Sequence, residues 1–113
     1  MNIPEATQQG LFVLQIRAVL EYAVQSGSFV NYLPLAKSLK IFSANKQIVQ
    51  ALMTLMEEDH KVGRPFICAL VVNSTSGLPG KGFFDKAKDL GYQFIDDRLF
   101  WKTQCNALGV ICK

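Results

Sequence analysis

Apolar residues recur at helical spacing over the first quarter of the chain. One stripe consists of Phe12, Ile16, Val19, Leu20 and Ala23. Residues three and four apart share a helix face, so this pattern predicts a helix over residues 5–26, starting after Pro4 and ending near Gly27. The apolar arc is widened by Leu11, Leu14, Ala18 and Tyr22. An arc this wide indicates packing on two sides, either within the core or partly against a dimer partner.

Two further helices are predicted after a short β-prone segment. Residues 27–32 (GSFVNY) predict a brief strand, and residues 33–40 predict a short helix with Leu35, Ala36 and Leu39 inward. Ser43 is a candidate N-cap for a longer helix over 44–59. The expected buried stripe of that helix is Ile48, Val49, Leu52, Leu55 and Met56. Its acidic end, residues 57–59, opposes the helix dipole, and we expect Lys61 or Arg64 to compensate it.

The second half begins with a continuous apolar run, FICALVV, directly after Pro65. An unbroken apolar run predicts a strand covered on both faces. A glycine-rich loop over 73–82 follows, then a short helix over 83–90 and a final helix over about 96–112. The inward residues expected in the final helix are Leu99, Phe100, Leu108 and Ile111.

Together these elements predict one α+β domain over residues 1–113 that is mostly helical. Its centre, about 28–82, is expected to be a winged-helix-like three-helix core with a short strand pair, and helices are added at both ends. With 113 residues, half of them hydrophobic and 19% charged, the chain is long and apolar enough to bury a core, which excludes wholesale disorder.

Charge is distributed unevenly along the chain. Residues 1–60 hold four Lys and Arg against five Asp and Glu, whereas residues 61–113 hold eight against four, a net charge of +4. An anionic partner is therefore expected to meet the second half.

Cysteine and histidine are too sparse for a metal or disulfide framework. Cys68, Cys105 and Cys112 are widely spaced, and His60 is the single histidine. The N-terminal residues lack the pattern of a signal peptide, and Gln15, Arg17 and Glu21 interrupt the apolar run over 11–24. We expect a cytoplasmic protein with no cofactor, no metal and no membrane partner.

The loop before the helix over 83–90 has two interpretations. Gly80, Lys81 and Gly82 could present backbone N–H groups and an ammonium to a phosphate or another small anion. Alternatively, the glycines form a tight turn at positive φ that seats Phe83 and Phe84 in the core. The two interpretations are compatible.

Three motifs follow one another within residues 28–82. Residues 30–36 read Val-Asn-Tyr-Leu-Pro-Leu-Ala, residues 47–49 read Gln-Ile-Val, and residues 67–72 read Ile-Cys-Ala-Leu-Val-Val before the glycine-rich loop. With these motifs, about half the chain resembles the DNA-binding domain of alkylguanine-DNA alkyltransferases and alkyltransferase-like proteins. There the corresponding motifs are Val-x-Thr-Tyr-x-x-Leu-Ala, Arg-Ala-Val and Pro-Cys-His-Arg-Val-Val. The string over 69–84 also resembles a segment of small bacterial proteins.

The resemblance implies a winged helix-turn-helix that meets DNA, with Cys68 at the acceptor position. Ala69 and Leu70 replace the histidine and arginine that follow the acceptor cysteine in that family, and Gln47 replaces its recognition-helix arginine. A thiol without a basic neighbour is a poor nucleophile, so we expect no alkyl transfer and no catalytic residue. Cys68 is then a small buried hydrophobe.

Three functions remain open. The first is a non-enzymatic nucleic-acid-binding or regulatory module, whose contact residues would be Asn45, Lys46, Gln47, Gln50, Lys61, Arg64 and Lys81. The second is a protein-interaction or dimerisation module, which the wide apolar arc of the first helix favours. The third is a small anionic-ligand binder that uses the 73–84 loop.

Overall fold

The first helix, α1, spans Glu5–Ser26, the range that the apolar spacing predicts. The computed structural model describes residues 5–32, 34–35 and 44–110. Val13, Ile16, Leu20 and Ala23 form the buried stripe of α1. The helix ends in a Schellman motif, in which the N–H groups of Gly27 and Ser28 donate to the carbonyls of Val24 and Ala23. Gly27 has φ +67°, a left-handed conformation that only glycine adopts without strain.

Helix α3 spans Ala44–Val62, three residues beyond its predicted end. Gly63, at φ +75°, closes it in the same way as Gly27 closes α1. Ile48, Leu55 and Met56 are buried as predicted, whereas Val49 is exposed. The helix predicted over 33–40 lies mostly outside the described residues. Pro34 and Leu35 are helical and Leu35 is buried, but 36–40 and the proposed cap Ser43 are not described.

The strand predicted over 66–72 is wrong for most of its length. Ile67–Leu70 form a 3-10 helix, η1, and only Val71–Val72 form a strand, β2. The whole segment is buried, as predicted. It coils because side chains satisfy its backbone: Asp59 accepts the Ile67 N–H at 3.0 Å, and the Trp101 indole donates to the Ala69 carbonyl at 2.8 Å. These two backbone groups therefore need no hydrogen bonds to a neighbouring strand.

Strand β1, Val30–Asn31, confirms the brief strand expected over 27–32. It pairs with β2 in parallel, with Val30 opposite Val71 and Asn31 opposite Val72. The architecture is thus α+β and mostly helical, with a two-stranded parallel sheet.

Two C-terminal helices complete the described fold. Helix α4 spans Lys81–Asp89 and buries Phe83 and Phe84, and α5 spans Asp97–Leu108 and buries Trp101 and Cys105. Leu99, expected inside, is 63% exposed. It lies two residues from Trp101, about 200° around the helix, so both cannot face the core. Gly109 ends α5 earlier than predicted, and Ile111 lies outside the described residues.

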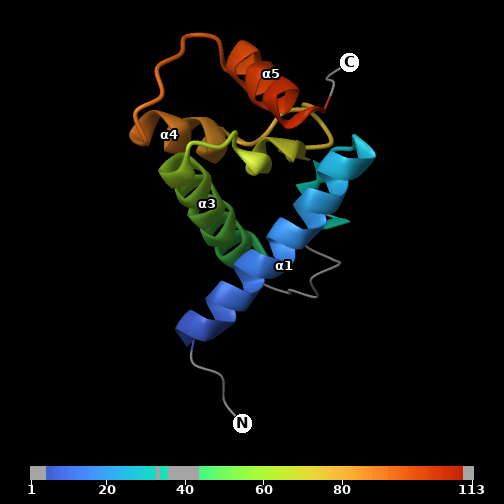
Figure 1. Cartoon of the computed structure of the whole chain (residues 1–113), viewed down its shortest axis with the longest axis vertical. Helices are drawn as coiled ribbons and strands as arrows, with labels where there is room; N and C mark the ends of the chain where they lie inside the picture. Colours follow the sequence, from blue (N-terminus) through green and yellow to red (C-terminus); the bar gives the residue numbers. More distant parts are fainter. Residues whose placement is uncertain (1–4, 33, 36–43, 111–113) are drawn as a thin grey trace.

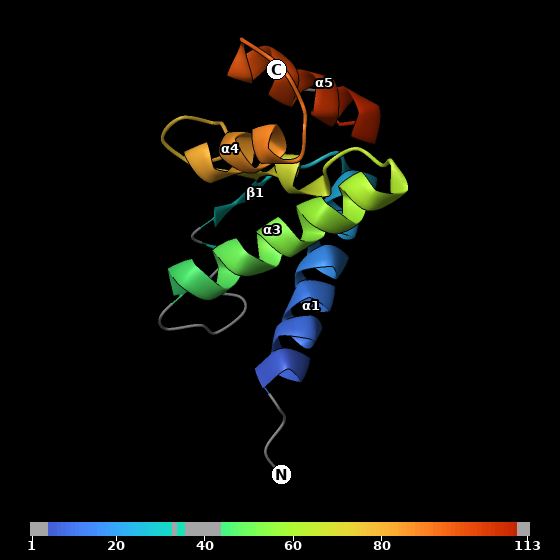
Figure 2. The same cartoon turned by 90° about the vertical axis from the view of Figure 1, so that its left-hand side faces the viewer.

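The elements are stacked along the long axis of the molecule. In Figures 1 and 2, α4 and α5 occupy one end, α1 and α3 cross below them, and η1 lies between. All four η1 residues are buried, and η1 contacts α1, α3 and α5. The core is therefore centred on this short helix. Within the described residues, no helix has both the length and the apolar character needed to cross a bilayer.

Candidate functional site

The seven residues predicted to contact nucleic acid are spread over three segments. Asn45, Lys46 and Gln47 lie in the first turn of α3, but their side chains are outside what the structure describes. Gln50 is exposed in the next turn, and Lys61 is exposed in the last. Because a helix rises 1.5 Å per residue, Lys46 and Lys61 are about 22 Å apart along the axis. No single cluster joins them.

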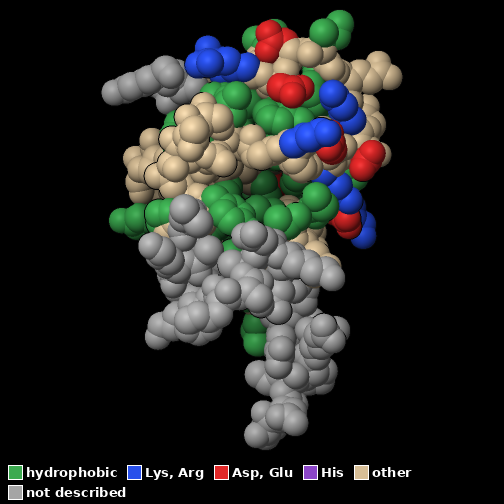
Figure 3. Space-filling model, turned by 180° about the vertical axis from the view of Figure 1, so that it is seen from behind, with side chains coloured by type: hydrophobic (Ala, Val, Ile, Leu, Met, Phe, Trp, Pro, Cys, Tyr) green, Lys and Arg blue, Asp and Glu red, His purple; other side chains and the backbone are tan. Residues whose placement is uncertain are grey.

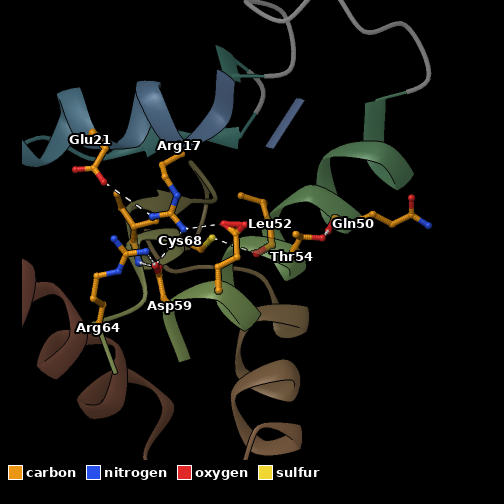
Figure 4. A network of polar contacts seen from close by, with 10 residues as sticks. Arg17, Glu21, Gln50, Leu52, Thr54, Asp59, Arg64 and Cys68 are labelled. Atoms are coloured by element: carbon orange, nitrogen blue, oxygen red, sulfur yellow. Dashed lines mark hydrogen bonds and ion pairs between the residues drawn. The ribbon is translucent and has the colours of Figure 1, made fainter. Parts of the chain in front are cut away.

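Arg64 belongs to a buried ion network (Figure 4). Asp59 is 1% exposed. Its Oδ1 accepts a hydrogen bond of 3.1 Å from Arg17 Nη2 and forms an ion pair of 3.1 Å with Arg64 Nη2. Its Oδ2 accepts the Ile67 N–H, and Arg17 also donates to Glu58 Oε1 at 3.1 Å. Burial alone lowers the pKa of Arg17, but the pairing with Glu58 and Asp59 raises it overall.

This network partly matches the sequence prediction. Arg64 compensates the acidic end of α3, as expected, whereas no ion pair of Lys61 is found within the described residues. Arg17 was missed because it lies 42 residues from Asp59 and nothing local in the sequence connects them. Arg64 is thus held by a structural carboxylate, and its remaining exposed surface is at the end of α3.

The glycine-rich loop delivers α4 onto the middle of α3. A Cβ at Gly82 would lie 3.5 Å from Met53 Cε, and Lys86 Nζ pairs with Glu57 Oε1 at 2.6 Å. Lys81 therefore begins α4 beside the middle of α3, away from Arg64 at its end.

The loop conformation decides part of its interpretation. Gly80, the N-cap of α4, has φ −68° and makes no side-chain cap. Positive φ occurs instead at Gly77, and the structure gives none for Gly80 or Gly82, so the turn interpretation is wrong for those two positions. The same interpretation also predicted that Phe83 and Phe84 lie in the core, and both are buried. The anion interpretation remains a prediction: the backbone N–H groups in the first turn of α4, which begins at Lys81, are the kind of group that favours a nearby anion.

A cavity of about 440 Å³ opens between α3 and this loop. Its lining residues are Tyr32, Val49, Leu52, Met53, Met56, Cys68, Val71, Val72, Asn73, Pro79, Gly80, Gly82 and Phe83. None of these described residues is charged. Seen from behind (Figure 3), a band of hydrophobic side chains crosses the molecule, with Lys, Arg, Asp and Glu side chains interspersed at its edge. The walls of the cavity beside α3 are therefore uncharged rather than positive.

Cys68 lines this cavity as an inert thiol. It is buried, and its Sγ donates to the Leu52 carbonyl at 3.3 Å (Figure 4). Burial, followed by the Asp59 carboxylate, raises the pKa of the thiol strongly, against a smaller opposing effect of Arg17. A protonated thiol at neutral pH is a poor nucleophile.

The remaining titratable candidates are surface or structural groups. His60 is exposed. Its ring forms a T-shaped contact with the ring of Tyr92, with 5.5 Å between the ring centroids. Asp96 caps α5 by accepting the Leu99 N–H at 3.0 Å. Over residues 5–32, 34–35 and 44–110, no three His, Cys, Asp or Glu side chains gather closely enough to hold a metal.

The cavity could not be recognised in the sequence because several segments separated along the chain build it. The helical spacing predicted Leu52 and Met56 only as core residues. Nothing in the sequence indicated that Met53 or Val72 would line a ligand site. No family model matches the chain, and no curated protein or solved structure shows significant similarity to it.

Proposed function

We propose that this protein is a non-enzymatic interaction module that assembles with a second copy of itself through the exposed face of α1. One observation carries the proposal: α1 has two apolar faces. Its buried stripe, Val13 to Ala23, packs against the core, while Leu11, Leu14 and Tyr22 are exposed. An amphipathic surface helix normally turns a polar face to water.

The exposed residues form a second stripe, which we call the outer stripe of α1. It consists of Leu11, Leu14, Gln15, Ala18, Tyr22 and Gln25. At 100° per residue these positions lie opposite the buried stripe, and none of them is charged. The exposed Glu21 borders the stripe about 20° from Leu14. Figures 1 and 2 show the N-terminal half of α1 extending beyond the other labelled helices, and Leu11, Leu14 and Tyr22 are exposed.

The outer stripe is self-complementary in an antiparallel, two-fold arrangement. If two copies cross at Ala18, Leu14 of one copy lies opposite Tyr22 of the other, and Leu11 lies opposite Gln25. The small side chain at the crossing allows the helices to approach closely, and a two-fold axis repeats each contact. Burying the leucines and tyrosines would supply the driving force.

Sedimentation equilibrium over a range of concentrations tests the proposal. The expected result is a monomer–dimer equilibrium that Leu14→Lys weakens at least tenfold in Kd, since this variant buries an unpaired charge. Leu99→Lys is the matched control because Leu99 on α5 is 63% exposed and Leu14 is 64% exposed. A wild-type monomer throughout, or equal effects of both variants, would contradict the proposal.

A second candidate is nucleic-acid binding on a winged-helix-like scaffold. It is supported by the net charge of +4 over residues 61–113 and by the exposed Lys61 and Lys81, for which no ion pair is found within the described residues. The parallel pairing of β1 with β2, in place of an antiparallel wing, and the use of Arg64 by Asp59 weaken that support.

Fluorescence anisotropy with a labelled DNA duplex tests this second candidate. Binding should fall steeply from about 50 mM to about 200 mM salt, and Lys61→Ala together with Lys81→Ala should reduce the salt dependence. No binding at about 50 mM salt would eliminate it. Phosphate or nucleotides in a thermal-shift assay test the third candidate, an anion at Gly80, Lys81 and Gly82.

A further inference from the structure

The cavity between α3, β2 and α4 has no role in the pairing of α1. Several segments wall it: α3 provides Leu52, Met53 and Met56, β2 provides Val72, and α4 provides Phe83. The loop over 73–80 closes another side through Pro79. A hollow enclosed by several segments differs from a groove along one helix, and its volume of about 440 Å³ falls in the range of small-molecule sites.

The lining determines what the cavity can hold. Its described walls carry no charge, so an ion entering it would lose hydration without gaining a counter-charge. Burial raises the pKa of Tyr32, which keeps this phenol neutral as well. An apolar lining of this kind favours apolar molecules, because burying apolar surface against it is favourable. Met53 and Met56, with their flexible thioethers, adapt to differing ligand shapes.

One polar group is placed to orient a ligand at the edge of the cavity. Asn73 is part of the lining, and its Oδ1 accepts the Thr75 N–H at 2.9 Å, while the Nδ2 group of the same amide is a hydrogen-bond donor. We propose that this cavity is a binding site for a small, uncharged, mostly apolar organic molecule, aromatic or aliphatic, that fills the space between Met53, Val72 and Phe83. The site is independent of the α1 interface.

The uncharged fluorophore N-phenyl-1-naphthylamine is a suitable probe because its emission rises in apolar surroundings. Titration of the full chain should give saturable binding with one site per chain and should raise the melting temperature. Met53→Trp adds an indole within the cavity, and Val49→Trp adds one at its mouth. Each should weaken binding at least tenfold. Gln50→Trp, on the same helix but outside the lining, should leave affinity within about twofold of wild type.

Several results would overturn this assignment. They are a linear, non-saturating titration, equal affinity in all three tryptophan variants, or loss of binding in Leu14→Lys, which would place the probe on the outer stripe of α1. Circular dichroism melts show whether each variant is folded. If Met53→Trp does not fold, Val49→Trp provides the test, because Val49 is exposed and tolerates a larger side chain more readily. Retained binding in a monomeric Leu14→Lys variant would separate the cavity from self-association.

Discussion

Asp59 joins three parts of the chain with one carboxylate. Arg17 on α1 and the Ile67 N–H of η1 donate hydrogen bonds to it, Arg64 after α3 forms an ion pair with it, and it is almost completely buried. A buried charge with several partners is costly to disturb, because removing one partner leaves others unpaired. The junction of α1, α3 and η1 therefore depends on this residue.

We expect Asp59→Ala to lower the free energy of unfolding by about 3–5 kcal/mol, since it leaves the buried Ile67 N–H without its acceptor and removes the buried carboxylate that pairs with Arg17 and Arg64. Urea denaturation measures this loss. Glu58→Ala is the control because Glu58 also pairs with Arg17 but is half exposed, and it should cost about 1 kcal/mol or less. Similar losses in the two variants would show that Asp59 is not the centre of the network.

Cys68 gives a prediction about pH. Burial and Asp59 raise the pKa of its thiol in the folded state, so the folded protein keeps a proton that the unfolded chain releases above about pH 8.5. Stability from this residue is thus complete below about pH 8.5 and is lost as the pH rises further. Between about pH 8 and pH 10, wild type should lose about 2 kcal/mol more than Cys68→Ala. Parallel curves for the two proteins in urea denaturation would contradict this.

Residue roles were only partly predictable from the sequence. Arg64 could be paired with the acidic end of α3 because the two are adjacent in the chain. Arg17 could not, since its contact depends on how α1 packs against α3. Leu99 was assigned to the core from its apolar character alone, whereas packing placed Trp101 there instead.

Among the elements, helices were predicted more accurately than the strand. Glycines with positive φ end α1, α3, α4 and α5. The stops at Gly27 and Gly91 were predicted from the sequence, whereas those at Gly63 and Gly109 were not. The apolar run over 66–72 indicated burial but could not distinguish a strand from a 3-10 helix. The 3-10 helix is stabilised by groups distant in the sequence, the Asp59 carboxylate and the Trp101 indole, which hydrogen-bond to its backbone.

The start of α5 gives a prediction at this scale. Asp96 is its N-cap, and the side chain accepts the Leu99 N–H. Asp96→Ala should destabilise the protein by about 1 kcal/mol, and Asp96→Ser should restore most of that loss because a hydroxyl can also accept the bond. Asp97→Ala, which removes a carboxylate from the same turn without removing a cap, should cost less in thermal unfolding. The reverse order would contradict the assigned cap.

For the whole molecule, stability is expected to be highest around η1 and lowest at the start of α1. The η1 residues are entirely buried, whereas Leu11 and Leu14 are exposed. In hydrogen exchange at low protein concentration, amides of η1 and the middle of α3 should exchange slowest, and those of residues 10–14 fastest among the helices.

Hydrogen exchange repeated at high protein concentration tests the proposed pairing of α1. If α1 pairs with a second copy, protection of residues 10–22 should increase while that of α5 stays constant. Unchanged exchange in α1 at concentrations where a dimer sediments would place the interface elsewhere.

The mostly helical class was predictable at this scale, but the spatial neighbours were not. The contact of Gly82 with α3 and the cavity beside it arise from tertiary packing between segments separated in sequence. The positive charge of the second half was visible in advance, yet charge counts do not show that Arg64 and Lys86 are occupied by carboxylates.

The dependence of Asp59 on Arg17 has a consequence for dissecting the protein. A fragment beginning at residue 27 would retain the stretch that resembles a DNA-binding domain, yet its carboxylate would keep only one of two guanidinium partners. The surfaces of α3 and η1 that α1 normally covers would be open to water. Such a truncated polypeptide should aggregate rather than fold, so the central segment should be studied only with its first helix attached.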